Sequence, residues 1–177
     1  MRYRRADVAG GTFFFTVNLA DRSSRLLIDH IDLLRDAVRN VRRAHPFDFV
    51  AMVVLPDHLH AIWVLPAGDR DYPLRWSLIK SGFSRRLRMF EPISQPRQRK
   101  RERGIWQRRY WEHRIRDDAD LERHVEYIHI NPVKHGYVQA PVEWLYSSIH
   151  RYIRQGLLSP EWAGGDERGE AEFGERG

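Results

Sequence analysis

The chain has 177 residues, enough for one well-packed domain and short for two, and its 42% apolar content can form a real core. It contains no cysteine, which excludes disulfides, thiolate nucleophiles and cysteine-ligated zinc or iron–sulfur centres. No run approaches the ~20 apolar residues that cross a bilayer, and the first residues lack an apolar signal-peptide core. We therefore expect a cytoplasmic, nucleoid-associated protein with no membrane partner.

The positive charge is concentrated in one part of the chain. The net charge is +6, but the segment from Arg75 to Arg116 alone carries 14 lysines and arginines against three glutamates. Residues 164–177 have the opposite character, with five acidic residues and two arginines. A local basic cluster of this kind predicts a polyanionic partner such as nucleic acid.

The first half of the chain reads as a strand, a helix and two further strands. Thr12–Ala20 is β-branched and aromatic, which is typical of a strand. Apolar residues at helical spacing predict a helix over Ile31–Ala44, with Asp29 as its N-cap. Phe47–Leu55 is apolar on both faces and should be a central strand. A turn at 56–57 then leads into a third strand, His58–Leu65.

The second half is expected to supply two helices, a loop and a strand. A helix fits Leu74–Met89, and the following residues 91–104 have two prolines and no periodicity, which predicts a mobile basic loop. Gln107–Ile115 reads as a fourth strand. The last helix runs over Asp117–Ile130, is capped by one of its first two aspartates and is ended by Pro132.

This order of elements predicts the α+β class. The sequence β-α-β-β-α-β is that of a ferredoxin-like, split β-α-β antiparallel sheet with helices on one face, here followed by a C-terminal tyrosine-bearing helix and an extension. We expect a single domain over residues 1–163. The Gly- and Glu-rich residues 164–177 should form an acidic, disordered tail.

Two histidines stand one residue apart in the stretch "LPDHLHAIWVL". Alternate side chains of a strand share a face, so His58 and His60 should point the same way and could converge on one cation. Neutral imidazole suits Mn, Zn, Ni or Co better than Mg. The alternative is that both are ordinary, hydrogen-bonded histidines at the start of a hairpin.

A second candidate lies on the last helix. Leu121, Val125 and Ile128 form the stripe that should pack on the sheet, and Tyr127 and Asn131 lie one turn apart beside it. An amide oxygen can ligate a metal, and a phenolate can attack phosphorus. Alternatively, Tyr127 is an amphipathic edge residue and Asn131 marks the end of the helix.

Three segments in this order carry a family resemblance: "HLH", "WQRRYWEHRIRD" and "YIHINPVKHGYV", followed later by "WLYSSIHRY". Together they resemble the REP-associated tyrosine transposases, which are relatives of the HUH single-strand insertion-sequence transposases with a Y1 transposase domain. The resemblance spans about Phe13 to Tyr152. It implies a nuclease and strand transferase that cleaves single-stranded DNA near REP- or BIME-like hairpins through a 5′-phosphotyrosine intermediate.

The resemblance also implies residue roles. By motif position, Tyr127 is the nucleophile, and His58, His60 and Asn131 hold a divalent metal ion, Mg²⁺ or Mn²⁺. Insertion-sequence relatives carry glutamine where this chain has Asn131, so the shorter side chain implies a slightly different metal geometry. His124, one turn before Tyr127, is a possible base for the phenol.

Several residues are candidates for DNA binding. Basic side chains of the loop and of the preceding helix could neutralise phosphates, and so could one lysine after the tyrosine helix: Arg85, Arg86, Arg88, Arg97, Arg99, Lys100, Arg101, Arg103 and Lys134. Unpaired bases could stack on Trp106, Tyr110 or Trp111, although these rings are equally candidates for the core.

Two other functions remain open from the sequence. A non-catalytic module of the same fold would bind hairpins without cleaving them, and a metal-dependent hydrolase would use water on the same histidine pair. Tyr137, Tyr146 and Tyr152 are rival nucleophiles in principle, but none has a partner like Asn131. Little linker precedes Asp117, which favours a monomer over a homodimer that exchanges the tyrosine helix.

Overall fold

The computed structural model describes residues 10–90, 104–164 and 173, with the backbone alone for 88–90. The elements, in chain order, are β1 (Thr12–Asn18), α1 (Leu26–Asp29), α2 (Ile31–Ala44), β2 (Asp48–Val54), β3 (His58–Val64), α3 (Tyr72–Phe90), β4 (Trp111–Arg114), α5 (Asp118–Lys134), the 3-10 helix η1 (Pro141–Glu143) and α6 (Ile149–Arg154).

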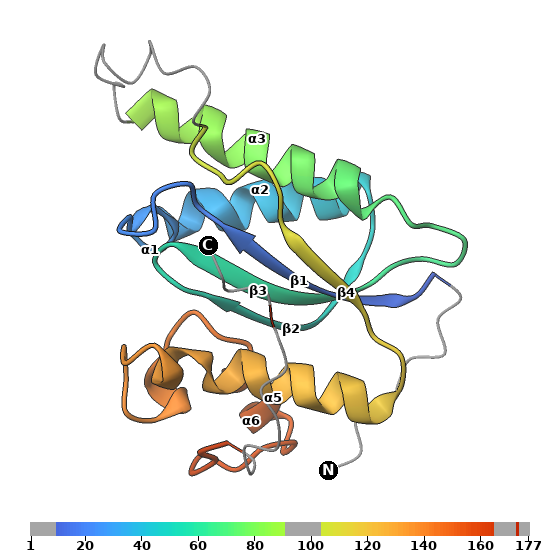
Figure 1. The fold of residues 1–177 in the computed structure, drawn as a ribbon, viewed down its shortest axis with the longest axis vertical. Helices are drawn as coiled ribbons and strands as arrows, with labels where there is room; N and C mark the ends of the chain where they lie inside the picture. The colour runs from blue at the N-terminus through green and yellow to red at the C-terminus, as the bar shows by residue number, and fades with distance from the viewer. Residues whose placement is uncertain (1–9, 91–103, 165–172, 174–177) are drawn as a thin grey trace.

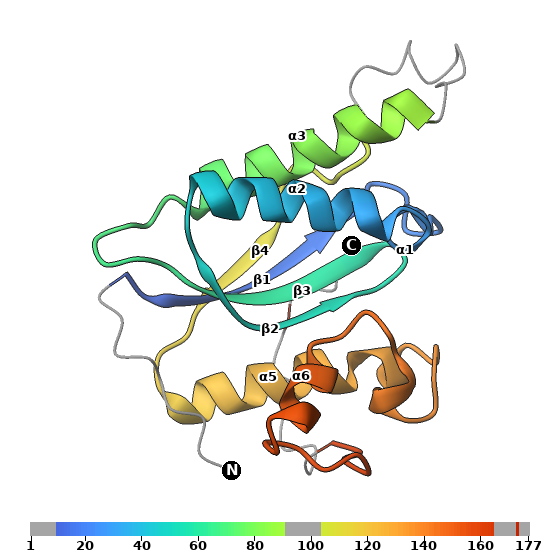
Figure 2. The same ribbon diagram turned by 180° about the vertical axis from the view of Figure 1, so that it is seen from behind.

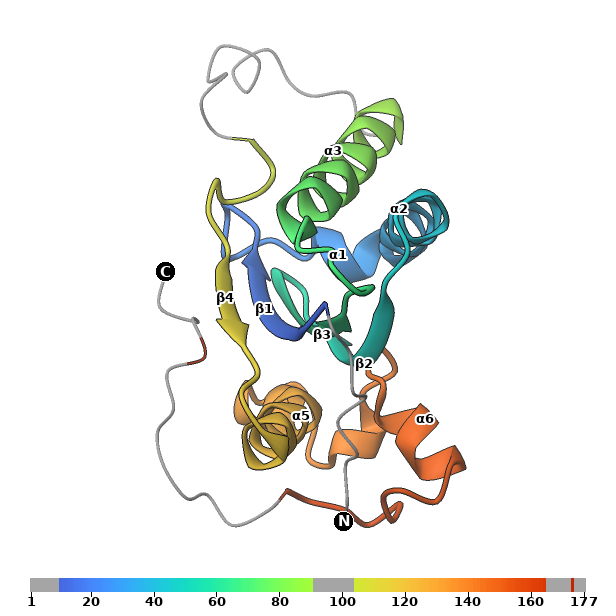
Figure 3. The same cartoon turned by 90° about the vertical axis from the view of Figure 1, so that its right-hand side faces the viewer.

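The four strands form one sheet in the order β2-β3-β1-β4, and every neighbouring pair is antiparallel. Strand β3 lies between β1 and β2, which is the split β-α-β arrangement expected from the sequence. Helices α2 and α3 cover one face of the sheet, and α5 and α6 lie on the other (Figures 1 and 2). The end-on view separates these three layers (Figure 3).

Strand β3 divides its side chains between the two faces. Leu59, Ala61 and Trp63 join the apolar cluster under α2 and α3, and Ile62 joins the cluster under α5. The predicted alternation is confirmed. Because His58 and His60 are in phase with Ile62, both histidines face the tyrosine-bearing helix α5.

Three local predictions were wrong. Asp29 is the last residue of α1, and α2 begins after His30 without a side-chain cap. Pro132 lies inside α5, which continues to Lys134; so close to the helix end, the missing N–H removes one ladder bond without breaking the helix. Strand β4 is shorter than expected because residues 106–107 pair separately with the end of β1.

The remaining predictions concern the cap of α5, the basic loop and the tail. Asp117 caps α5, as expected, by accepting a hydrogen bond from the Asp120 N–H at 2.8 Å. The expected basic loop lies outside the described residues except for Gly104, and so does most of the tail. Phe173, the one described residue beyond 164, packs its ring against that of Tyr127. None of the helices described is long and apolar enough to span a membrane.

Candidate active site

His58 is held in one orientation by a carboxylate. Its Nδ1 lies 2.8 Å from Asp57 Oδ1, and because an ionised carboxylate only accepts, Nδ1 carries the hydrogen and donates it. The lone pair of the neutral ring is therefore on Nε2. That nitrogen is buried and has no hydrogen-bond partner among the described residues. A buried imidazole nitrogen in this state is suited to a metal ion.

Asp57 is itself fixed by a second partner. Arg22 Nε donates to Asp57 Oδ2 at 2.6 Å, and Arg22 Nη1 donates to Asn18 Oδ1 at 2.8 Å. Burial raises the pKa of Asp57, but its hydrogen bonds with His58 and Arg22 and the positive charge of Arg22 outweigh burial and hold the pKa below its ordinary value. The carboxylate is therefore ionised when it orients His58.

His60 is oriented by a hydroxyl. Its partner in the β1–β3 ladder is Thr16, and Thr16 Oγ1 lies 2.8 Å from His60 Nδ1. The same hydroxyl donates to the Phe173 carbonyl oxygen at 2.6 Å. Because Thr16 has one hydroxyl hydrogen and a carbonyl can only accept, His60 Nδ1 must donate to Thr16. The Nε2 of His60 then carries the lone pair, as in His58.

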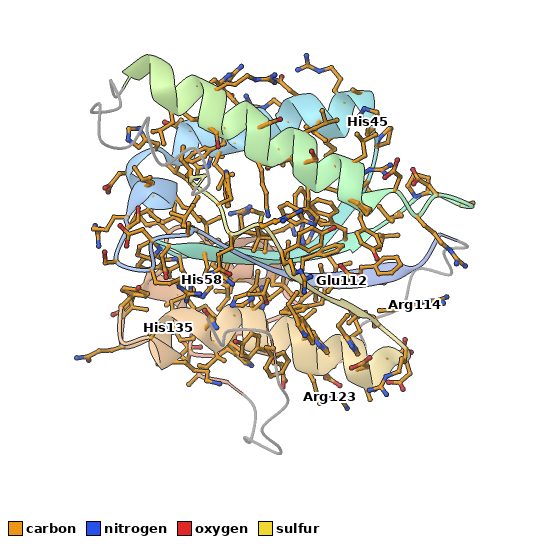
Figure 4. The ribbon with its side chains drawn as sticks, turned by 45° about the horizontal axis from the view of Figure 1, so that its top comes forward. His45, His58, Glu112, Arg114, Arg123 and His135 are labelled. Atoms are coloured by element: carbon orange, nitrogen blue, oxygen red, sulfur yellow. The ribbon has the colours of Figure 1, made fainter. Side chains whose placement is uncertain are left out.

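Helix α5 presents Tyr127 and Asn131 to this histidine pair. The Tyr127 ring lies 5.2 Å from the His60 ring, and eight residues later the His135 ring lies 5.1 Å from the His58 ring. Asn131 is fully buried and lies midway between them on the helix. Figure 4 shows His58 and His135 close together between the sheet and α5. Helix α5 thus runs antiparallel to β3 with these residues at the junction.

Aromatic rings enclose Tyr127. The Phe173 ring stacks on it with a centroid distance of 3.6 Å, and the Phe14 ring meets it edge-on at 6.2 Å. Phe14 also stacks on His60 at 5.6 Å. Lys134 Nζ lies 5.1 Å from the centre of the Tyr127 ring. Tyr127 is 6% exposed, so these neighbours cover almost all of it.

A second polar cluster lies at the start of α5. Ligand atoms of His113, Asp120 and His124 lie within 4.8 Å of one another, which is a possible metal-binding group. The Asp120 carboxylate, however, already accepts hydrogen bonds from His113, from the Arg116 N–H and from Arg123. Burial raises the pKa of Asp120, but these donors lower it far below its usual range. Two neighbouring guanidinium groups oppose a bound cation here.

The same cluster fixes the tautomer of His124. Its Nδ1 lies 2.7 Å from the Asp120 backbone oxygen and must donate to it, so Nε2 has the lone pair. Burial lowers the pKa of His124, which is therefore neutral near pH 7. Its ring packs against His113, Phe14 and Phe173 at 4.7, 4.8 and 5.1 Å.

Comparisons with known proteins show the family of the chain. The chain is 45% identical over 162 residues to a REP-associated tyrosine transposase of Escherichia coli (strain K12), covering 92% of this chain and 90% of that protein. A relative from Haemophilus influenzae, named for the same family, is 44% identical over 163 residues, covering 92% and 93%. The chain belongs to the REP-associated tyrosine transposase family.

A solved structure supports the assignment independently. It is of a REP-associated tyrosine transposase bound to a REP hairpin, and it superposes with a TM-score of 0.83 at 43% identity, covering 99% of this chain and 98% of that one. No family model matches the chain. The resemblance inferred from the sequence and the expected fold are both confirmed.

The structure locates several of the residues expected to bind DNA in this chain. Arg85 is exposed, whereas Arg86 forms an ion pair with Asp36 at 3.0 Å. Lys134 lies at the candidate site. The side chain of Arg88 lies outside the described residues, as do Arg97, Arg99, Lys100, Arg101 and Arg103.

The other aromatic candidates are also placed. Trp111 packs with Phe14 on the α5 face, whereas Trp106 and Tyr110 lie on the α3 face. Among the rival tyrosines, Tyr152 is buried and donates its hydroxyl to the Val50 oxygen at 2.9 Å. Tyr137 and Tyr146 contact Trp144 rather than the histidine pair.

Sequence reasoning missed four residues that complete the site: Asp57, Thr16, His135 and Phe173. The first is adjacent to His58, and the acid-before-histidine order was a usable signal. His135 follows Asn131 by one helical turn, so extending the helix past Pro132 would have found it. Strand pairing brings Thr16 to the site, and Phe173 comes from the far end of the chain. Neither contact leaves a pattern in the local sequence.

Proposed function

We propose that this chain is a metal-dependent endonuclease and strand transferase for single-stranded DNA, which cleaves next to a REP-type hairpin and uses Tyr127 as its nucleophile. The observation that carries the proposal is the juxtaposition of the Tyr127 ring and the oriented imidazole of His60. The family supports it, since a relative is bound to a REP hairpin.

The cleavage step would be an in-line displacement at phosphorus. The Tyr127 phenolate oxygen forms a bond to the scissile phosphorus, the bond to the 3′ oxygen breaks, and that oxygen takes up a proton. The products are a 5′-phosphotyrosine and a free 3′-hydroxyl. Because the phosphate ester bond is conserved, a second 3′-hydroxyl can attack the phosphotyrosine, rejoin the strand and release the phenol without a nucleotide cofactor.

The donor atoms fit a divalent cation, Mg²⁺ or Mn²⁺. His58 and His60 would hold it through Nε2, and the Asn131 amide oxygen would complete the set; two imidazoles favour Mn²⁺ over Mg²⁺. When bound, the cation would neutralise charge on the scissile phosphate and orient it. Asp57 and Thr16 would act as positioning residues, because each fixes the tautomer of one histidine.

Two neighbours of Tyr127 would assist the attack. The Lys134 ammonium provides a positive charge beside the ring, where the phenolate develops. His124 has an available lone pair on Nε2, but Phe14 and Phe173 contact both its ring and that of Tyr127. We therefore assign His124 as a base only for a state in which Phe173 has moved away.

A single copy of the chain supplies every residue of the proposed site. Helix α5 follows β4 closely in the same chain and packs directly on β2 and β3. No residue of a second copy is needed, which favours activity as a monomer.

The test is a covalent-adduct assay on a denaturing gel, with labelled hairpin DNA carrying single-stranded flanks and with Mn²⁺ or Mg²⁺. We expect a protein–DNA band that Tyr127→Phe abolishes and that Tyr146→Phe, the same change away from the histidines, retains. His58→Ala should abolish cleavage while leaving much of the hairpin binding.

The alternatives give different results in the same assay. Cleavage without an adduct would favour the water-using hydrolase. Binding without cleavage or adduct, across several hairpins, would identify a non-catalytic hairpin-binding module. Unchanged cleavage in His58→Ala would reject the metal site.

A further inference from the structure

A pocket lies on the opposite side of the sheet from Tyr127, between α3 and the segment 104–110 that leads into β4. Its volume is about 460 Å³, within the usual range for small-molecule sites. One wall is a face of α3 with the hydroxyls of Ser77, Ser81 and Ser84, and the other wall includes Trp106 and Tyr110.

The lining has the chemistry of a site for a nucleotide. Besides the three hydroxyls it offers the cations Lys80 and Arg108 and the amide of Gln107, and none of the described residues that line it is acidic. Aromatic faces with hydrogen-bond donors and positive charge are what single-stranded nucleic acid requires, since bases stack and phosphates pair.

Lys80 is the central residue of this pocket. Its Nζ donates to the Gln107 backbone oxygen at 3.1 Å and lies 5.2 Å from the Tyr110 ring and 5.9 Å from the Trp106 ring. Burial lowers the pKa of Lys80 to about 8, so the ammonium is charged at neutral pH although no carboxylate of the lining neutralises it. An incoming phosphate would supply the missing counter-charge.

The pocket is connected to the candidate active site through the end of β1. The Gln107 N–H donates to the Asn18 oxygen at 3.0 Å, and Asn18 is the ladder partner of His58. The wall of the pocket is thus hydrogen-bonded to the strand that borders the histidine pair. One DNA strand that passes around this edge of the sheet could contact both places.

We propose that the pocket lined by Lys80, Trp106 and Tyr110 binds one unpaired nucleotide of the DNA strand, with its base against the aromatic rings and its phosphate on Lys80. The inference deepens the proposed function and rests on it for the identity of the strand as DNA substrate. The proposal gives Trp106 and Tyr110 a role in DNA binding, whereas Trp111 packs against the apolar cluster under α5.

The test measures binding of labelled oligo-dT and of two hairpins, one with a single-stranded dT flank and one without. Lys80→Met should weaken binding of oligo-dT and of the flanked hairpin, and should reduce the slope of log K against log salt by about 0.7, the value for one phosphate on a single strand. Tyr110→Ala should weaken the same two ligands about ten-fold through lost stacking. Both variants should bind the flankless hairpin like the wild type.

Arg154→Met is the matched control, because it removes one positive charge from an exposed position at the end of α6 that is neither a candidate DNA contact nor part of the pocket lining. Equal losses in Lys80→Met and Arg154→Met, or no measurable binding of oligo-dT by the wild type, would overturn the subsite. Circular dichroism establishes that each variant is folded; Lys80→Met replaces a half-buried charge and should keep the fold even if Tyr110→Ala does not.

The adduct assay separates the two proposals. If the wild type forms the Tyr127 adduct but Lys80→Met binds oligo-dT normally, the subsite is wrong and the proposed function stands. If no adduct forms with any hairpin, yet binding of oligo-dT depends on Lys80, the subsite stands and the proposed chemistry is wrong.

Discussion

The two faces of the sheet use the same strand for different purposes. On the face covered by α2 and α3, β3 contributes Leu59, Ala61 and Trp63 to a continuous apolar core. On the face covered by α5, the same strand contributes His58 and His60, and only Ile62 joins the apolar cluster. A single alternation of side chains thus supplies both the core and the candidate site.

The comparison shows how a small domain can bury polar groups. The polar residues that are nearly or fully buried on the α5 face include Thr16, His58, His60 and Asn131. Burying polar groups is unfavourable unless they are satisfied, and here neighbouring side chains or a ligand must do it. The apolar face opposite provides the stability that tolerates this arrangement.

The largest effect is expected from breaking the apolar face. Trp63 is fully buried and packs on Trp76 and Phe47 with ring centroids 4.2 and 4.1 Å apart. Trp63→Ala should lower the free energy of unfolding by about 3–5 kcal/mol, as for other large aromatic truncations. Chemical denaturation measures it. His60→Ala, three residues earlier on the other face, is the comparison and should lose less stability; an equal loss would contradict the division between the faces.

Removing the charge of Asp57 should weaken the site without disturbing the core. The Asp57→Asn side chain has the same shape but no negative charge, so it no longer orients the His58 imidazole as an ionised acceptor. Loss of a hydrogen-bond partner behind a metal ligand typically lowers metal affinity by about 10–100-fold. Calorimetric titration with Mn²⁺ measures this. Asp48→Asn, an exposed carboxylate at the start of β2, is the control. Unchanged Mn²⁺ affinity in Asp57→Asn would exclude His58 as a ligand held by Asp57.

Removing the ring of Phe173 should expose the nucleophile. The stacked aromatic contact with Tyr127 contributes about 0.5–1.5 kcal/mol, so Phe173→Ala should speed formation of the covalent adduct by about two- to ten-fold. Initial rates from quenched samples measure it. The hairpin affinity should stay constant, and a slower rate would mean that Phe173 supports the reaction rather than covering Tyr127.

The smallest effect concerns Lys80, the half-buried cation of the pocket beside α3. Its pKa is about 8 in the folded chain against 10.5 when unperturbed, so between these values the unfolded state binds more protons and stability rises with pH. The stability of the wild type relative to Lys80→Met should therefore increase by on the order of 1 kcal/mol from pH 8 to pH 10.5 and level off well below pH 8, where Lys80 is protonated in both states. Urea denaturation across this range tests it; a flat difference would contradict the depressed pKa.

The sequence predicted the sheet because each strand carries its own pattern. The alternation in His58–Val64 is local, and it determined correctly which residues share a face. The helix boundaries were less predictable. Asp29 is a strong local signal for a helix cap, but it is the last residue of α1. Pro132 is a strong signal for a helix end, but it lies so near the end of α5 that the helix tolerates it.

The site was predictable only where its residues lie in short motifs. Tyr127 and Asn131 are one turn apart, and His58 and His60 are one strand repeat apart, so both pairs were visible. What joins the pairs is packing between α5 and β3, and what fixes the His60 imidazole is its ladder partner Thr16, 44 residues away along the chain. Such contacts depend on tertiary structure and leave no local pattern.

The unbroken course of α5 through Pro132 has a mechanical consequence. Tyr127 and Asn131 belong to one continuous helix, so their separation is set by the helical pitch and not by loops or tertiary contacts. Tyr127, the proposed nucleophile, and Asn131, the proposed metal ligand, should therefore move together: a tilt of α5 that carried a tyrosine-linked strand away from β3 would also withdraw Asn131 from the histidines. One movement of α5 would thus both carry the attached DNA away and take apart the cation site.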